Sequence, residues 1–174
     1  MTRIGVISDT HGSLSAIAVC VKAAGAVDGW FHLGDYASDA VKLREMTGLP
    51  VFSVLGNCDG FMSAGSVEDS FLSGQKTVSS ERVVTVERAR IFLCHGHRYD
   101  VDMGPWTLSY RAEELSAAAA LYGHTHRASL SASGSVLLLN PGSPSRPRGM
   151  SKPGFAILEI DKGDVNARLV TIGE

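Results

Sequence analysis

Short apolar runs alternate with amphipathic stretches over the first third of the chain. Three of the runs are too short for buried helices and are rich in β-branched or aromatic residues, so they predict buried strands. These runs lie at 3–8, 30–33 and 50–55. Between them, residues 14–24 and 39–46 predict helices, and Ser13 and Gly25 are the expected caps of the first helix. The order strand, helix, strand, helix, strand is typical of a parallel α/β sheet.

The pattern changes after residue 60. Residues 61–75 are polar and glycine-rich, which predicts a loop or a short helical excursion. Two runs that flank Glu87-Arg88 predict a β-hairpin, and Pro105 begins a predicted helix over 106–118. The hairpin runs are 82–86 and 89–94. A second, largely antiparallel group of strands is expected to include 129–133, 136–139, 155–160 and 165–172.

Neither an internal repeat nor a linker divides the sequence, so we expect a single domain over residues 1–174. The simplest assembly of the predicted elements is an α/β fold, a four-layer α-β-β-α sandwich of two mixed sheets flanked by helices. The Pro/Gly/Ser/Arg-rich stretch at 141–153 is expected to be a loop between two strands.

Composition narrows the function classes. The net charge of −2 offers no basic field for a nucleic-acid backbone, so nucleic acid is not an expected partner. No apolar run approaches the ~20 residues that a membrane span needs, and the N-terminal run is too short for a signal peptide. Three cysteines without CxxC spacing favour a reducing, cytoplasmic setting.

Polar side chains gather where predicted strands end, at the edge where ligands bind in α/β sheets. Two carboxylates, four imidazoles and one amide suit divalent ions such as Mn, Fe, Zn, Co or Ni. Seven groups are too many for one tetrahedral ion, but they suffice for two ions if a carboxylate bridges. The candidate metal ligands are Asp9, His11, Asp35, Asn57, His95, His124 and His126.

Each of these residues also has a structural interpretation when it is considered alone. Asp9 and His11 could serve the start of the first helix, and Asp35 after Gly34 is an ordinary turn dipeptide. His32 is interpreted as a hydrogen-bonded core histidine, because it lies in an apolar strand. We interpret Trp106 as a core residue; the alternative is a subunit interface with Phe61 and Met62. Arg146 and Arg148 are interpreted as solvated loop charge rather than as phosphate contacts.

Five short motifs occur in a fixed order, each after a predicted strand. They are Asp9-x-His11, Gly34-Asp35, Gly56-Asn57-x-Asp59, His95-Gly96 and Gly123-His124-x-His126. Together they resemble the signature of the calcineurin-like metallophosphoesterases. The chain length, the Cys58-containing motif and the loop that begins Asn140-Pro141-Gly142-Ser143 look like the small single-domain prokaryotic phosphodiesterase branch.

The resemblance implies a dinuclear site and a reaction. One metal would take Asp9, His11 and His126, and the other Asn57, His95 and His124, with Asp35 as the bridge. A hydroxide between two divalent ions would attack phosphorus in line. Manganese is the expected ion, with nickel, iron, zinc or cobalt as alternatives. The expected substrate is a small phosphate ester, with diesters preferred to monoesters, and the expected assembly is a homo-oligomer, a dimer or tetramer.

One position departs from the wider superfamily, which usually has histidine where this chain has Cys58. A thiol is a weak hydrogen-bond donor, so the group that protonates the leaving oxygen is in question. We take His97 as the candidate catalytic replacement, beside the ligand Asn57; the alternative is that His97 supports a ligand instead of contacting the substrate. The branch that the chain resembles also carries cysteine here, so the change does not predict inactivity.

The alternative function is a non-catalytic, protein-binding scaffold of the same fold, as is known for a retromer subunit. All seven candidate ligands are present in this chain, which favours an enzyme, because a disused site need not keep clustered polar groups.

Overall fold

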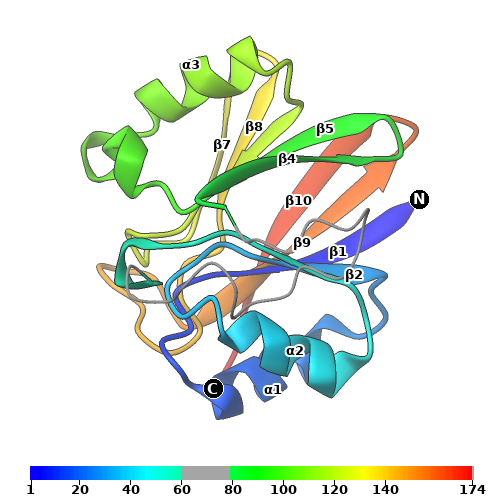
Figure 1. Ribbon diagram of the computed structural model, residues 1–174, viewed down its shortest axis with the longest axis vertical. Helices are drawn as coiled ribbons and strands as arrows, with labels where there is room; N and C mark the ends of the chain where they lie inside the picture. Colours follow the sequence, from blue (N-terminus) through cyan, green and yellow to red (C-terminus); the bar gives the residue numbers. More distant parts are fainter. Residues whose placement is uncertain (60–78, 174) are drawn as a thin grey trace.

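The computed structural model describes residues 1–59 and 79–173. Within these ranges two five-stranded sheets pack face to face, with helices on the outer face of each (Figure 1). This is the four-layer α-β-β-α sandwich that the sequence predicts. The prediction for residues 61–75, and the roles considered for Phe61 and Met62, lie outside the described residues.

The first sheet has the strand order β10-β9-β1-β2-β3. Strands β1, β2 and β3 are parallel, and β9 pairs antiparallel with both β1 and β10. The strands are β1 (Thr2–Ile7), β2 (Gly29–His32), β3 (Val51–Ser53), β9 (Gly154–Asp161) and β10 (Asp164–Thr171).

The second sheet has the order β4-β5-β6-β8-β7. The outer pairs β4–β5 and β7–β8 are antiparallel hairpins, whereas β6 is parallel to both of its neighbours. The strands are β4 (Glu81–Val86), β5 (Ala89–Cys94), β6 (Ala119–Leu121), β7 (Ser129–Ser133) and β8 (Val136–Asn140).

The predicted grouping of the last two strands is wrong. Strands β9 and β10 belong to the first sheet, where β9 lies against β1 with Ile4 opposite Leu158. The reason is visible in β9, which is buried on both faces from Phe155 to Leu158. A strand of this kind needs a neighbour on each side and a layer on each face. The second sheet is accordingly mixed rather than largely antiparallel.

Three apolar layers hold the sandwich together. The central layer joins the two sheets and contains Val6 and Leu158 from the first and Leu93 and Leu121 from the second. An outer layer packs the first sheet against helices α1 (Leu14–Ala24) and α2 (Asp39–Thr47). The other outer layer packs the second sheet against α3 (Trp106–Glu114). The layers fix the strand ends of both sheets relative to each other.

The helices follow their sequence signals with two exceptions. Helix α1 buries Ile17, Cys20 and Ala24 and ends at Gly25, although the Ser13 hydroxyl makes no capping hydrogen bond within the described residues. Helix α3 ends four residues before the predicted boundary. The Ala118 N–H donates to the Arg90 carbonyl of β5, so the alanine run joins the sheet despite its high helix propensity.

Trp106 is not a core residue, because 68% of its surface is exposed. It lies at the start of α3, a helix whose buried face is formed by Leu108, Ser109 and Ala112. None of the helices that the structure describes is long and apolar enough to cross a membrane.

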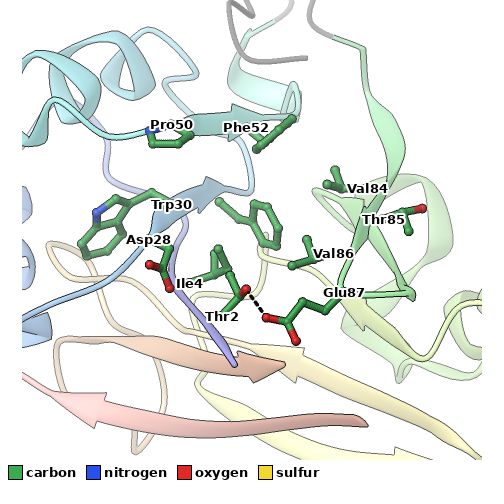
Figure 2. Close-up of a pocket in the computed structure, with 12 residues that line it drawn as sticks. Thr2, Ile4, Asp28, Trp30, Pro50, Phe52, Val84, Thr85, Val86 and Glu87 are labelled. Carbon is green, nitrogen blue, oxygen red and sulfur yellow. Dashed lines mark hydrogen bonds between the residues drawn. The ribbon is translucent and has the colours of Figure 1, made fainter. Parts of the chain in front are cut away.

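The sandwich has chemically different ends. A cavity of about 320 Å³ opens between the edge strands β3 and β4, at the amino ends of β1 and β2 (Figure 2). Its walls are largely apolar, including Ile4, Phe31 and Val86, and the Thr2 hydroxyl donates to Glu87 at its rim. The histidine motifs follow the carboxyl ends of the strands instead, so this cavity is separate from the candidate site.

Candidate metal centre

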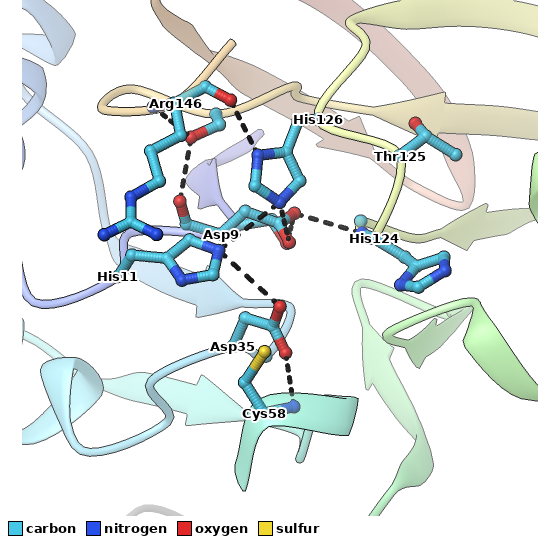
Figure 3. A network of polar contacts seen from close by, with 12 residues as sticks. Asp9, His11, Asp35, Cys58, His124, Thr125, His126 and Arg146 are labelled. Atoms are coloured by element: carbon cyan, nitrogen blue, oxygen red, sulfur yellow. Dashed lines mark hydrogen bonds and ion pairs between the residues drawn. The ribbon is translucent and has the colours of Figure 1, made fainter. Parts of the chain in front are cut away.

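All seven candidate ligands meet where strands of both sheets end. Asp9 and His11 follow β1, Asp35 follows β2, and Asn57 begins a 3₁₀ turn after β3 (Asn57–Asp59). The second sheet contributes His95 directly after β5, and His124 and His126 after β6. Figure 3 shows Asp9, Asp35 and the imidazoles of His11 and His126 converging from these separate elements.

Four of these residues form one compact group. Asp9, His11, Asp35 and His126 each offer an atom, and all four atoms lie within 4.8 Å of one another. The Nε2 atom of His126 lies 3.3 Å from Asp9 Oδ1 and 3.3 Å from His11 Nε2. Two carboxylates and two imidazoles in such a cluster suit one divalent ion.

A second group adjoins the first. The amide oxygen Oδ1 of Asn57 lies 3.1 Å from His95 Nε2 and 2.9 Å from His124 Nδ1. Asp35 touches both groups, because its Oδ1 lies 3.3 Å from His95 Nε2 and its Oδ2 lies 3.6 Å from His11 Nε2. The candidate ligands therefore lie in two groups that meet at Asp35.

Hydrogen bonds outside the site determine which nitrogen each ring presents. His95 donates from Nδ1 to the Leu33 carbonyl at 2.7 Å, and His126 donates from Nδ1 to the Arg146 carbonyl at 2.6 Å. In the neutral rings, both Nε2 atoms therefore direct a lone pair into the site. Metal-binding histidines are commonly oriented by such carbonyl contacts.

The site contains more acceptors than donors. Asp9 Oδ2 accepts from the Ser8 hydroxyl and the His124 N–H, but the buried Oδ1 has no hydrogen-bond partner among the described residues. Nearby, the lone pair of His95 Nε2 faces oxygens of Asn57 and Asp35. Acceptors that face one another in a buried place are unfavourable unless a cation lies among them. The residues therefore fit a divalent ion.

The backbone is strained at most of these ligands. Left-handed φ values are uncommon for residues other than glycine, cost of order 1–3 kcal/mol each and cluster at functional sites. Five of the seven candidate ligands adopt them: Asp9 (55°), His11 (47°), Asp35 (53°), His124 (69°) and His126 (57°). The surrounding structure must hold these conformations against their cost.

The glycines of the motifs permit close backbone approach. A Cβ on Gly123 would lie 1.9 Å from Ser8 Oγ, and one on Gly56 would lie 2.3 Å from Asp35 Oδ1. Gly34 would place a Cβ 2.6 Å from the Gly56 nitrogen. No side chain fits at these distances, so these motifs require glycine for steric reasons.

Comparison with known proteins identifies the family. A sequence model of the calcineurin-like phosphoesterase superfamily domain matches residues 2–163. The chain belongs to this superfamily. It is 34% identical over 173 residues to a probable metallophosphoesterase of Methanothermobacter thermautotrophicus, covering 98% of this chain and 92% of that protein.

Two further relatives agree with the assignment to the superfamily. The phosphodiesterase YfcE of Escherichia coli K12 is 29% identical over 178 residues, covering 92% of this chain and 89% of that protein. The crystal structure of a predicted phosphoesterase from Streptococcus pneumoniae has a TM-score of 0.70 at 34% identity, covering 92% of this chain and 83% of that one. The resemblance inferred from the five motifs is thus confirmed, and so is the fold.

Sequence reasoning missed the residues whose side chains hydrogen-bond to the backbone of the candidate site. The hydroxyl of Ser143 donates to the Asp9 carbonyl at 2.8 Å, and that of Ser145 donates to the Thr10 carbonyl at 2.9 Å. Asn140 donates through Nδ2 to the Gly123 carbonyl at 2.8 Å. These contacts hold the strained backbone around Asp9 and His124. The only sequence signal was the Asn140-Pro141-Gly142-Ser143 loop, which resembled the family without a stated role.

His32 and Asp39 form a second buried support. His32 donates through Nε2 to the Thr10 hydroxyl at 2.9 Å and accepts from the Gly34 N–H through Nδ1. Asp39 accepts from the Thr10 hydroxyl and the Gly12 N–H. His32 is therefore the hydrogen-bonded core histidine that the sequence predicts. Burial lowers the pKa of His32, which is consistent with a neutral ring.

The buried carboxylate of Asp9 and the neighbouring histidines shift each other's pKa values. Burial alone would raise the pKa of Asp9, but His126, His95 and the Ser8 hydroxyl together lower it. Asp9 in turn raises the pKa of His126, against the opposing effect of burial. Burial lowers the pKa of His11, which the carboxylate of Asp35 only partly offsets. These shifts keep Asp9 ionised and available as a ligand.

Cys58 and His97 lie on the open side of the centre. Cys58 is exposed, but partial desolvation of its sulfur and the neighbouring carboxylate of Asp35 raise the pKa of the Cys58 thiol to about 11. The ring of His97 lies 5.5 Å from that of His95 and 6.1 Å from that of His124. Asn57 and His97 line a pocket of about 310 Å³ that also includes Arg98. His97 therefore lies beside the second group of ligands and outside the compact first group.

Asp59 positions the turn that carries Asn57, and its removal should destabilise the protein. Its carboxylate is buried and accepts from two backbone N–H groups, of Gly56 at 2.7 Å and of Ala37 at 2.9 Å. Each buried N–H left unpaired costs about 1–3 kcal/mol. We therefore expect Asp59→Ala to lower the free energy of unfolding by about 2–6 kcal/mol, measured by urea denaturation.

Asp28→Ala is the matched control, because the exposed Asp28 carboxylate also accepts from a backbone N–H, that of Arg3. Its loss should cost less than about 1 kcal/mol, since water replaces the carboxylate. An equal loss of unfolding free energy in the two variants would contradict the expected role of Asp59 in holding the turn that carries Asn57.

Proposed function

We propose that this chain is a phosphoesterase that hydrolyses small phosphate esters with two divalent ions, manganese first among the candidates. The supporting observation is the pair of ligand groups that meet at Asp35. Its two carboxylate oxygens face His11 on one side and His95 on the other. A carboxylate between two cations reduces their mutual repulsion, which is the usual arrangement in dinuclear hydrolases.

Bound ions of this kind lower the pKa of a coordinated water to about 7 and offset negative charge on a phosphoryl group. The candidate ligands carry only two formal negative charges, from Asp9 and Asp35. Two divalent ions would therefore leave the loaded site cationic, which favours an anionic phosphate ester over a neutral substrate.

The access route supports the same proposal. Asp9, Asp35 and His95 are buried, whereas Asn57 and Cys58 are exposed. A substrate can therefore approach from the side of Asn57 and the pocket beside His97. Arg146 is exposed, and Figure 3 shows its guanidinium beside His11, where it could pair with a phosphate oxygen.

Within the proposed reaction we assign Asn57 and His97 separate roles. Asn57 donates through Nδ2 to the Cys58 sulfur, which turns its amide oxygen toward the two histidines as a neutral ligand. His97 carries a ring nitrogen, Nδ1, that is buried and has no partner among the described residues. We assign His97 to protonation of the leaving oxygen, because the thiol of Cys58 is a weak donor.

The preference for diesters rests on two observations. YfcE, a relative with 29% identity, is named a phosphodiesterase. A neutral thiol at position 58 also leaves one strong donor fewer for the additional charge of a monoester dianion. The scaffold alternative is not favoured, because every candidate ligand is retained and all seven converge.

The first test is metal binding and turnover by the purified protein. Calorimetric titration of chelator-treated protein should show the uptake of two equivalents of Mn²⁺. The loaded protein should hydrolyse bis-p-nitrophenyl phosphate faster than p-nitrophenyl phosphate, followed by absorbance of the released phenolate. Absence of both metal uptake and turnover with Mn²⁺, Ni²⁺ or Co²⁺ would remove the enzyme proposal.

Asp35→Asn tests the bridge. An amide has a single acceptor oxygen and no charge, so it cannot serve both ligand groups. Activity should fall below about 1% of the wild-type value, a loss of about 2.7 kcal/mol of transition-state stabilisation. Asp164→Asn makes the same chemical change on an exposed residue at the start of β10 and should leave kcat/KM unchanged. Full activity of Asp35→Asn would contradict the assignment.

His97→Gln tests the leaving-group donor. A general acid contributes most when the leaving oxygen is basic, typically about 100-fold or more. Activity on alkyl esters should therefore fall by about 100-fold, while bis-p-nitrophenyl phosphate is nearly unaffected. The measurement is the slope of log kcat against leaving-group pKa. The slope should become steeper in His97→Gln, and adding Cys58→His to that variant should make it shallower. A uniform loss of activity on all esters would exclude His97 as the acid.

A further inference from the structure

One acidic residue outside the ligand set touches the candidate centre. Asp102 lies in a 3₁₀ turn (Val101–Met103), and its Oδ2 is 2.9 Å from Nε2 of His124. We propose that Asp102 is a positioning residue for the ion held by Asn57, His95 and His124. This inference rests on the proposed function, in which that group holds a metal.

His124 presents a different nitrogen from the other oriented histidines. His95 and His126 direct Nε2 into the centre because their Nδ1 atoms donate to backbone carbonyls. His124 instead directs Nδ1 toward Asn57 Oδ1, at 2.9 Å, and Nε2 toward Asp102. Nδ1 can ligate only if the ring proton stays on Nε2, and the carboxylate of Asp102 is the acceptor that keeps it there.

His124 also depends on this contact for its orientation. Its side chain is 24% exposed, compared with 3% for His126 and 0% for His95. Packing fixes a buried ring, but a partly exposed ring needs a directional contact. Asp102 can provide it because its turn is anchored: Val101 is buried in the apolar layer under α3, and the Met103 N–H donates to the Asp100 carbonyl.

Charge supplies a second reason for an outer carboxylate here. The group around Asp9 has one carboxylate of its own and shares Asp35 with its neighbour. The group around Asn57 has a neutral amide in place of the first carboxylate. Hydrogen bonding to a carboxylate makes an imidazole a stronger ligand, so Asp102 partly compensates for the missing charge.

The two groups should therefore respond differently to the loss of Asp102. Within the described residues, the contact of Asp102 with the candidate ligands is made through His124, so Asp9, His11 and His126 keep their geometry. Loss of an outer hydrogen-bond partner typically costs 10- to 100-fold in metal affinity. We expect this loss of affinity for only one of the two ions, the one held by Asn57, His95 and His124.

The experiment is calorimetric titration of chelator-treated full-length protein with Mn²⁺, for the wild type, Asp102→Ala, Asp102→Asn and Asp100→Asn. Asp102→Ala should bind one ion as the wild type does and the other about 10- to 100-fold more weakly. Asp102→Asn keeps an acceptor oxygen for Nε2 and should lose less than Asp102→Ala. Asp100→Asn removes the same charge two residues away, at a left-handed position (φ 49°) that suits asparagine, and should bind as the wild type does.

Several outcomes would overturn the inference. They are unchanged binding of both ions by Asp102→Ala, equal weakening of both ions, or an equal effect of Asp100→Asn. Circular dichroism of each variant separates a binding defect from unfolding, and the Asp102→Asn variant retains the test if Asp102→Ala does not fold. If the wild type binds two ions and Asp102→Ala has no selective effect on either, only the role of Asp102 is refuted. No ion bound by the wild type would refute the proposed function and, with it, this role.

Discussion

The carboxylate of Asp35 is the contact on which the candidate centre depends. Its Oδ1 accepts from the Cys58 N–H at 2.9 Å and faces His95, while its Oδ2 faces His11. The backbone of Gly56 lies so close that a Cβ there would be 2.3 Å from Oδ1. The carboxylate therefore has little freedom to turn, and both ligand groups are positioned around it. A displacement of Asp35 would separate them.

The arrangement of the two sheets makes this contact possible. Asp35 follows a strand of the first sheet, and His95 follows a strand of the second. The apolar layer between the sheets holds these strand ends together, and the Leu33 carbonyl accepts from His95 across that interface. Left-handed backbone at Asp9, His11 and Asp35 is one cost of this convergence. Hydrogen bonds from Ser143 and Ser145 to the carbonyls of Asp9 and Thr10 hold that backbone in place.

Much of this could be predicted from the sequence, for identifiable reasons. Helix α1 matched its prediction because its apolar spacing and Gly25 are local signals. The candidate ligands could be listed because five motifs place a potential ligand at a strand end, in four of them beside a glycine. The position of β9 was not found, since strand partners that are distant in sequence leave no local signal, and β9 pairs with β1. Asp102 was not found for the same reason, because it meets His124 only through the fold.

The two ligand groups differ in burial and charge, and this difference bears on how a hydrolase of this kind could work. Asp9 and His126 are buried and strained, and Asp9 Oδ1 has no hydrogen-bond partner among the described residues, so the first group is costly without a cation. The second group combines the exposed amide of Asn57 with a histidine whose ring is held by a solvent-exposed carboxylate. A neutral ligand leaves more positive charge on an ion, so an ion in the second group would attract an anionic substrate more strongly. If two ions bind as proposed, the second group would thus be the better placed of the two to receive the phosphate, because it is more accessible and its ligands neutralise less of the ion's charge.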